Sequence, residues 1–175
     1  VISDLDDTVI RTDATRLLPM LRRTLLQNAR TRLPFTGVAE FYGGVPLGDD
    51  GAGGDPVFYV SSSPWNLYGV LTEFLDYQTI PLGPLMLRDW GISSGGVLPR
   101  GHGAHKTSAI RQILDCYRDL PFILIGDSGQ EDPEIYRDIV HQYGKRIRAI
   151  YIRNVTPEPL RTRAIGELAE EVKTA

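Results

Sequence analysis

The stretch Val1-Ile2-Ser3-Asp4-Leu5-Asp6-Asp7-Thr8 decides how the rest of the chain is interpreted. Two β-forming residues, Val1 and Ile2, precede three aspartates that fall within four positions. Carboxylates this close repel one another, so the cluster costs stability unless a divalent cation neutralises it. The plain alternative is a solvated acidic loop with a helix cap. The favoured interpretation is a strand that ends at a charged functional site.

The spacing Asp-x-Asp-x-Thr is what a phosphoryl-transfer enzyme with an aspartate nucleophile needs. Asp4 is placed to attack phosphorus, and Asp6 to protonate the leaving oxygen and later to take a proton from water. An exposed aspartate has a pKa of about 3.9, so Asp6 needs burial or acidic neighbours that raise it. We therefore predict Asp4 as the nucleophile and Asp6 as the general acid and base.

Length and composition limit the classes of protein to consider. The chain has 175 residues, of which 42% are hydrophobic and 23% charged, as in one ordinary globular domain. A net charge of −3 gives no basic field for nucleic acid, and no apolar run approaches the roughly 20 residues of a membrane-spanning helix. The single cysteine, Cys116, favours a reducing compartment. We expect a cytoplasmic protein with no evident protein partner.

Residues 11–32 contain six arginines and one acidic residue, together with leucines at helical spacing. Arg16, Arg23 and Arg30 are seven residues apart and share one face if the segment is helical. A basic solvated face on a packed helix accounts for this pattern. The sharper alternative is a surface that meets an anionic substrate or an anionic membrane.

Strands alternate with helices along the whole chain. Strands are predicted at 57–60, 84–87, 122–125 and 147–152, and helices near 37–41, from Pro64, from Ala104, from Pro133 and over 160–173. This order favours an α/β fold with a doubly wound, mostly parallel sheet and helices on both faces. Ligands bind beyond the carboxyl ends of the strands in such folds, where Asp4, Ser61 and Asp127 fall.

Two further clusters supply groups suited to phosphate. Ser61 directly follows a strand, where its hydroxyl and nearby N–H groups are able to hold a phosphoryl oxygen, while Ser63 and Pro64 are expected to start the next helix. Lys106 lies at the positive end of a helix, where a cation is unfavourable by roughly 0.3–1 kcal/mol unless an anion is near. We predict Lys106 as a phosphate clamp.

The acidic loop after the fourth predicted strand completes the set. Asp127 has no local structural role, whereas Asp132 before Pro133 is expected to cap a helix. Asp127, Asp4 and the carbonyl of Asp6 offer the oxygen ligands that Mg²⁺ prefers. The metal ligands are therefore predicted among Asp4, Asp6, Asp127 and Asp132, with Glu131 as the alternative to the last.

Four clusters in this order resemble the haloacid-dehalogenase superfamily of aspartate-nucleophile phosphatases. The motifs are Asp4-Leu5-Asp6-Asp7-Thr8, Ser61, Lys106, and Gly126-Asp127 with Asp132. The longer stretches Tyr59 to Trp65, Leu87 to Gly91 and Gly126 to Glu134 resemble the catalytic domain of the actin-patch-associated phosphatidate phosphatase family. That resemblance implies Mg²⁺-dependent hydrolysis of phosphatidate to diacylglycerol through an aspartyl phosphate, with Leu5 and Ser62 at the substrate phosphate.

The resemblance also suggests how the chain is divided. We expect residues 1–175 to form a single catalytic domain, excised from a longer chain, with residues 9–56 as a small cap insert. A small cap leaves the site open to a lipid phosphate at a membrane surface, with which the protein would make peripheral contact. Trp65, Tyr68 and Trp90 are expected to pack in the core, although an apolar entry for acyl chains is the alternative.

Other functions compete with this one. The same chemistry can hydrolyse a soluble phosphomonoester or a phosphoprotein, because Asp4 and Asp6 act only on the phosphate group of the substrate. A phosphoryl-accepting receiver module also combines acids, a hydroxyl and a lysine on a doubly wound sheet, but in a different order along the chain. A non-catalytic lipid-binding module is the remaining alternative.

Overall fold

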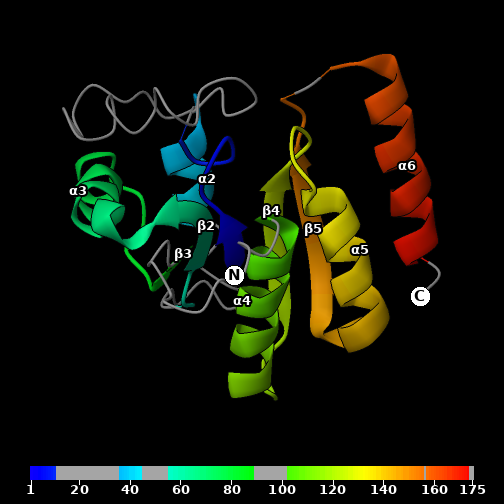
Figure 1. Ribbon diagram of the computed structural model, residues 1–175, viewed down its shortest axis with the longest axis horizontal. Coiled ribbons are helices and arrows are strands. Elements are labelled where there is room, and N and C mark those ends of the chain that lie inside the picture. Colours follow the sequence, from blue (N-terminus) through cyan, green and yellow to red (C-terminus); the bar gives the residue numbers. More distant parts are fainter. Residues whose placement is uncertain (11–35, 45–54, 89–101, 156, 174–175) are drawn as a thin grey trace, which may run out of the picture.

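A five-stranded sheet is the centre of the molecule. The computed structural model describes residues 1–10, 36–44, 55–88, 102–155 and 157–173 (Figure 1). The strands run in the order β3-β2-β1-β4-β5, and each neighbouring pair is parallel. Their bounds are β1 Ile2–Asp4, β2 Phe58–Pro64, β3 Leu85–Arg88, β4 Phe122–Asp127 and β5 Ile147–Arg153. The predicted α/β fold with a parallel sheet is confirmed.

Helices follow the strands as the alternating pattern predicts. The α-helices of the described residues are α2 Val38–Gly44, α3 Tyr68–Tyr77, α4 His102–Cys116, α5 Asp132–Tyr143 and α6 Pro159–Lys173. Short 3-10 turns, η3 Trp65–Leu67 and η4 Gly144–Arg146, lead into α3 and β5.

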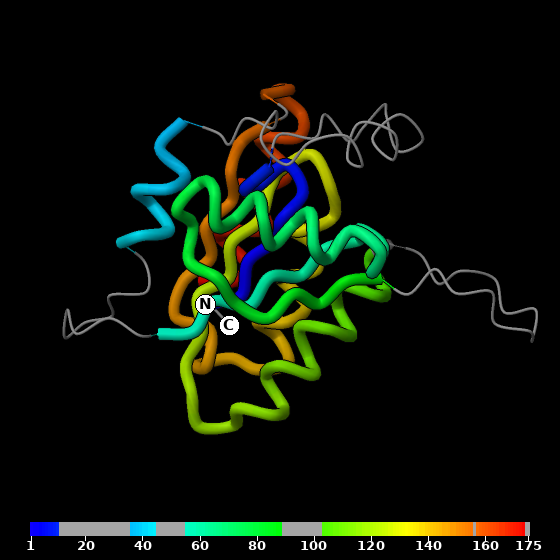
Figure 2. Tube along the Cα trace, turned by 90° about the vertical axis from the view of Figure 1, so that its left-hand side faces the viewer, coloured from blue at the N-terminus to red at the C-terminus, as the bar shows by residue number. Residues whose placement is uncertain are grey.

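The two faces of the sheet carry separate hydrophobic clusters. Tyr59 of β2 belongs to one cluster, with Tyr42 of α2 and Phe74 of α3. Its neighbour Phe58 points to the other face and packs with residues of α4 and α5 such as Ile110. This alternation follows from the two-residue period of a strand. The helices therefore cover both faces, and Figures 1 and 2 show α2 and α4 on opposite sides of the molecule.

The central strand β1 is where the winding of the sheet reverses. The chain passes from β1 outward through β2 to β3, and then returns to the other side of β1 for β4 and β5. Such a reversal leaves space beyond the carboxyl ends of the strands, which is where ligands bind in open α/β sheets. Asp4 ends β1 and Asp127 ends β4, so the fold brings them to this edge.

The segment after β2 differs from its prediction. Strand β2 continues through Pro64, and the η3 turn that follows has no side-chain cap, so the expected N-cap role of Ser63 is wrong. The expected core positions of Trp65 and Tyr68 are also wrong, because their exposed fractions are 50% and 45%. Leu67 takes the core position instead.

The predicted cap insert is described only in part. The arginine-rich stretch 11–32 and the loop 45–54 lie outside the described residues, as does Trp90. Within the insert, α2 packs against the sheet through Val38 and Tyr42. None of the described helices has the length and apolar character needed to span a membrane.

A buried hydrogen bond fastens α5 to the sheet. The Tyr136 hydroxyl donates to the Ile125 carbonyl of β4 at 2.8 Å, and Tyr136 is almost fully buried. We expect Tyr136→Phe to lower the free energy of unfolding by about 1 kcal/mol, since a buried carbonyl loses a partner. Urea denaturation measures the change.

Tyr143→Phe on the same helix is the matched control, because its hydroxyl donates to Asp115 at 3.0 Å in an exposed position. Equal losses in the free energy of unfolding in the two variants would show that burial does not increase the contribution of the Tyr136 hydrogen bond to stability.

Candidate active site

The turn after β1 orients the side chain of Asp4. The Leu5 carbonyl accepts hydrogen bonds from the N–H groups of Val9 and Ile10, at 3.1 and 3.0 Å, which folds the chain back on itself. The Thr8 hydroxyl then donates to Asp4 Oδ2 at 3.1 Å. The threonine of the motif thus orients the side chain of Asp4.

Lys106 is the cation at the centre of the site. Its ammonium, from the second turn of α4, lies 2.7 Å from Asp4 Oδ1 and also contacts Asp132 Oδ1. All three side chains are almost completely buried. Burial works to lower the pKa of Lys106, but the carboxylates of Asp4 and Asp132 raise it above its usual value. The lysine therefore stays charged and links β1, α4 and α5.

Asp4 needs more positive charge than one lysine provides. Burial raises the pKa of Asp4 well above its usual value, Lys106 opposes this shift, and Asp132 and Asp6 add to it. Near neutral pH a further cation would keep Asp4 ionised, as a nucleophile requires.

Asp127 has an oxygen that suits such a cation. Its Oδ1 accepts hydrogen bonds from the N–H groups of Gly129 and Gln130, at 2.6 and 3.1 Å. Its Oδ2 is buried and has no hydrogen-bond partner among the described residues. Burial, with Asp132 second, raises the pKa of Asp127 to about 6. A bound cation would satisfy this oxygen and favour its charge.

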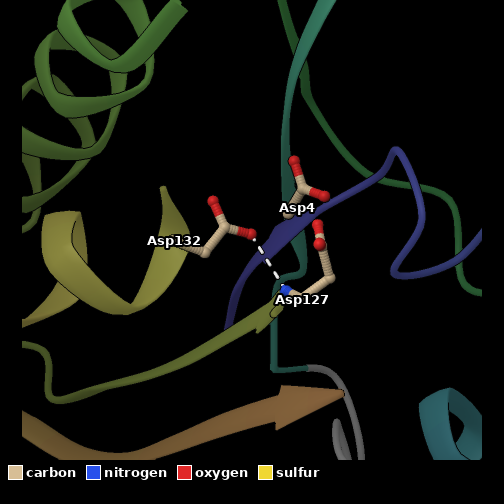
Figure 3. A group of neighbouring side chains, drawn as sticks. All are labelled: Asp4, Asp127 and Asp132. Atoms are coloured by element: carbon tan, nitrogen blue, oxygen red, sulfur yellow. Dashed lines mark hydrogen bonds between the residues drawn. The ribbon is translucent and has the colours of Figure 1, made fainter. Parts of the chain in front are cut away.

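Asp4, Asp127 and Asp132 converge as a metal-binding group would (Figure 3). One carboxylate oxygen from each lies within 4.8 Å of the others, and all three residues are buried. Both oxygens of Asp132 have partners, Lys106 at one and the Asp127 N–H at 3.0 Å at the other. Both oxygens of Asp4 also have partners, Lys106 and the Thr8 hydroxyl, so Asp127 Oδ2 is the carboxylate oxygen of this group with the greatest capacity to bind a cation. Glu131 is exposed.

A glycine makes this arrangement sterically feasible. A Cβ on Gly126 would lie 2.4 Å from Asp132 Oδ2 and 2.8 Å from Asp132 Cβ. Only a residue without a side chain allows Asp132 to approach the end of β4 so closely. The expected capping role of Asp132 is wrong, because Glu131 takes the N-cap position of α5 and the Asp132 carboxylate faces the site.

Asp6 forms a second polar group with the serines after β2. The Ser61 hydroxyl donates to Asp6 Oδ2 at 2.6 Å, and the Ser63 hydroxyl to Oδ1 at 3.4 Å. The Ser63 N–H in turn donates to Ser61 Oγ at 2.9 Å. Burial raises the pKa of Asp6, with the Ser61 hydrogen bond opposing it. A raised pKa is the property that the acid and base role requires.

The fold thus brings most of the predicted site residues to one edge of the sheet. The Leu5 side chain is buried in the core, so only its backbone is left to face a substrate, and Ser62 is half-buried beside Ser61. Sequence reasoning did not assign the contact of Ser63 with Asp6. The local sequence pattern predicts a helix cap at Ser63, whereas Asp6, its partner in the structure, lies 57 residues away along the chain.

The raised pKa of Asp127 predicts a pH dependence of stability. Between the unfolded-state pKa of about 3.9 and the folded-state pKa of about 6, the folded protein binds more protons, so its stability falls as pH rises. In chelator, we expect the free energy of unfolding of the wild type to decrease relative to Asp127→Asn across this interval and to level off above it.

Chemical denaturation of both proteins at several pH values measures the difference. Saturating Mg²⁺ at pH 7 should then stabilise the wild type more than Asp127→Asn. A difference that does not vary with pH would contradict the assigned environment of Asp127.

Comparisons with known proteins agree with this geometry. The family model for the phosphatidate phosphatase APP1 catalytic domain matches residues 1–154. Phosphatidate phosphatase APP1 of Saccharomyces cerevisiae is 32% identical over 157 residues, and an uncharacterized protein of Schizosaccharomyces pombe is 28% identical over 157 residues. These alignments cover 87% and 89% of this chain.

The chain spans about a quarter of the length of each yeast relative, since the matched part is 25% of both. No solved structure matches the chain. The family match covers every site residue from Asp4 to Asp132, in a chain whose fold places those residues together. The chain therefore belongs to the family of the phosphatidate phosphatase APP1 catalytic domain.

Proposed function

We propose that this chain is the catalytic domain of a Mg²⁺-dependent phosphatase that converts phosphatidate to diacylglycerol. One observation carries the proposal: buried Asp4 contacts Lys106 and groups with Asp127 and Asp132, in a member of the APP1 family. The substrate comes from the name of the budding-yeast relative. We further propose one catalytic domain over residues 1–175, with residues 9–56 as a small cap.

In the first step, Asp4 attacks the phosphorus of the bound phosphate monoester. The bond between phosphorus and the glycerol oxygen breaks, and Asp6 transfers its proton to that oxygen, which releases diacylglycerol. The Ser61 and Ser63 hydroxyls hold the Asp6 carboxyl in place, and the pKa raised by burial keeps a proton available. The phosphoryl group is then bonded to Asp4.

In the second step, Asp6 takes a proton from a water molecule, which attacks the phosphorus. The bond between phosphorus and Asp4 breaks, inorganic phosphate leaves, and Asp6 is protonated again. Lys106 holds the Asp4 side chain in both steps and offers positive charge to the phosphate oxygens. The backbone of Leu5 and Ser62 is proposed to contact the same phosphate.

The residues present fit a divalent cation. Asp4, Asp127 and the Asp6 carbonyl would hold it, with Asp132 in support, and Mg²⁺ is proposed because it prefers a few carboxylates together with phosphate oxygens. When bound, the ion supplies charge neutralisation and orientation of the phosphate for in-line attack. The buried Asp127 Oδ2 is the protein atom that most needs it.

Exposed aromatic residues beside the site favour a lipid over a soluble phosphomonoester. Trp65 and Tyr68 stack with ring centroids 5.8 Å apart, and both side chains are about half exposed. Trp65 is two residues and Tyr68 five residues beyond Ser63, one of the serines that hold Asp6. Trp and Tyr favour the interface between lipid and water, where the ring is apolar and its polar atom stays hydrated. We propose that this pair rests on the lipid surface while the headgroup enters the site.

The mechanism predicts the effect of removing the nucleophile. Asp4→Asn should reduce Mg²⁺-dependent phosphate release from phosphatidate in mixed micelles by at least about a thousandfold, because an amide cannot form the covalent intermediate. The wild type, quenched in acid during turnover, should gain the mass of one phosphoryl group on the peptide that contains Asp4.

Asp6→Asn is the companion variant, since it keeps the nucleophile and the backbone carbonyl but loses the proton donor. It should turn over very slowly, and soluble phosphomonoesters are assayed beside phosphatidate. Activity confined to soluble esters would retain Asp4 as nucleophile and discard the lipid substrate. Full activity of Asp4→Asn on any substrate would refute the mechanism.

The aromatic pair gives a separate test of the lipid surface. Trp65→Ala with Tyr68→Ala should lower activity on phosphatidate in vesicles by about tenfold, since interfacial contact is lost, and leave hydrolysis of a soluble phosphomonoester unchanged. Tyr77→Ala is the matched control, because Tyr77 is 58% exposed at the opposite end of α3. Parallel losses on both substrates would instead assign the pair a structural role.

A further inference from the structure

Arg161 connects the last helix to the acidic loop of the site. It lies in the first turn of α6, beyond residues 1–154 that match the family model. Its Nε donates to the Ser128 carbonyl at 2.8 Å, and its Nη2 donates to the Gln130 carbonyl at 2.7 Å. The same guanidinium pairs with both carboxylate oxygens of Glu134 on α5. One side chain thus contacts three residues, Ser128, Gln130 and Glu134.

The two carbonyls belong to the loop that shapes Asp127. Ser128 follows Asp127 directly, and the N–H groups of Gly129 and Gln130 donate to Asp127 Oδ1. The Ser128 carbonyl belongs to the same peptide group as the Gly129 N–H, so the arginine holds that N–H directly. The next peptide group, which carries the Gln130 N–H, lies between the two carbonyls that the arginine holds. Asp127 Oδ2, the oxygen without a partner among the described residues, is left in a defined direction.

A second set of bonds attaches the same loop to the segment before α6. The Ser128 hydroxyl donates to Asn154 Oδ1 at 3.2 Å and accepts from the Val155 N–H at 2.9 Å. The Ser128 N–H donates to the Arg153 carbonyl at 2.9 Å. The loop is therefore fixed to the end of β5 and, through Arg161, to α6.

We propose that Arg161 is a positioning residue that holds the 127–131 loop so that Asp127 is ready to bind the cation. The inference rests on the proposed metal role of Asp127. Arg161 acts through the loop and not on the substrate, because its Nε, Nη1 and Nη2 all contact protein groups. Partners that hold a metal ligand in place typically change metal affinity by about 10–100-fold when they are lost.

The shape of arginine is essential to this role. Its planar fork presents several N–H donors in fixed directions, so one group reaches two carbonyls and a carboxylate together. A lysine ammonium keeps the charge but lacks the fork. We therefore expect Arg161→Lys to lose most of the positioning effect.

The experiment compares Arg161→Ala and Arg161→Lys with the control Arg163→Ala. Arg163 is on the same helix, 80% exposed, and pairs only with Glu167 within α6 among the described contacts. Amide hydrogen exchange in chelator follows Gly129 and Gln130 directly and does not depend on activity. Calorimetry with Mn²⁺ and with Mg²⁺ then measures ion affinity.

We expect exchange at Gly129 and Gln130 to accelerate about tenfold or more in both Arg161 variants, and ion affinity to fall about tenfold. Arg163→Ala should leave both unchanged. If Arg161→Ala unfolds, Arg161→Lys carries the test alone, since it retains the side-chain length and charge. Wild-type exchange and wild-type affinity in a folded Arg161 variant would overturn the inference.

The failure of the proposed function has a different signature. A wild-type protein that binds neither ion overturns the metal site and, with it, the positioning role proposed for Arg161. A wild type that binds the ion, with equal affinity in the Arg161 variants, overturns the positioning role alone.

Discussion

The contact of the Lys106 ammonium with Asp4 and Asp132 is the interaction on which the site depends. A buried ion pair costs desolvation on both sides, and removal of one partner leaves a buried charge without compensation, an effect of about 3–5 kcal/mol. Here the three charges come from α4, β1 and α5, so the pairing also fixes how these elements pack. Two carboxylates share one ammonium, and Asp127 adds a third acid nearby. The excess negative charge is what makes the site receptive to a cation.

The geometry around this centre is set by the sheet. Parallel strands present their carboxyl ends at one edge, and the reversal at β1 puts Asp4 between the serines of β2 and Asp127 of β4. The close approach of Asp132 depends on Gly126, where any side chain would collide with the carboxylate. The chemistry is thus divided between two groups. In one, Asp4 contacts the Lys106 ammonium. In the other, the Ser61 and Ser63 hydroxyls hold the Asp6 carboxylate.

Two features border the site without belonging to its group of charged residues. The exposed Trp65–Tyr68 stack lies next in sequence to the serines, so contact with a lipid surface and retention of the proton donor would involve one continuous segment. On the other side, the 127–131 loop is fixed by β5 and α6, which are the last elements of the chain. The loop that follows Asp127 therefore has partners on a helix that the family match does not include.

The parallel α/β fold follows from the order of residues along the chain, because alternating apolar segments of strand and helix period have few other ways to bury their surface. The same order also determined the acids, serine and lysine of the site, since each stands where a strand ends or a helix starts. The tertiary structure alone decided which partners these groups take. Local pattern gave Ser63 and Asp132 capping roles, but Asp6 and Lys106 compete for them from distant positions. Arg161 had no local signal at all, because its carbonyl partners lie more than 30 residues away and carbonyls are the same in every residue.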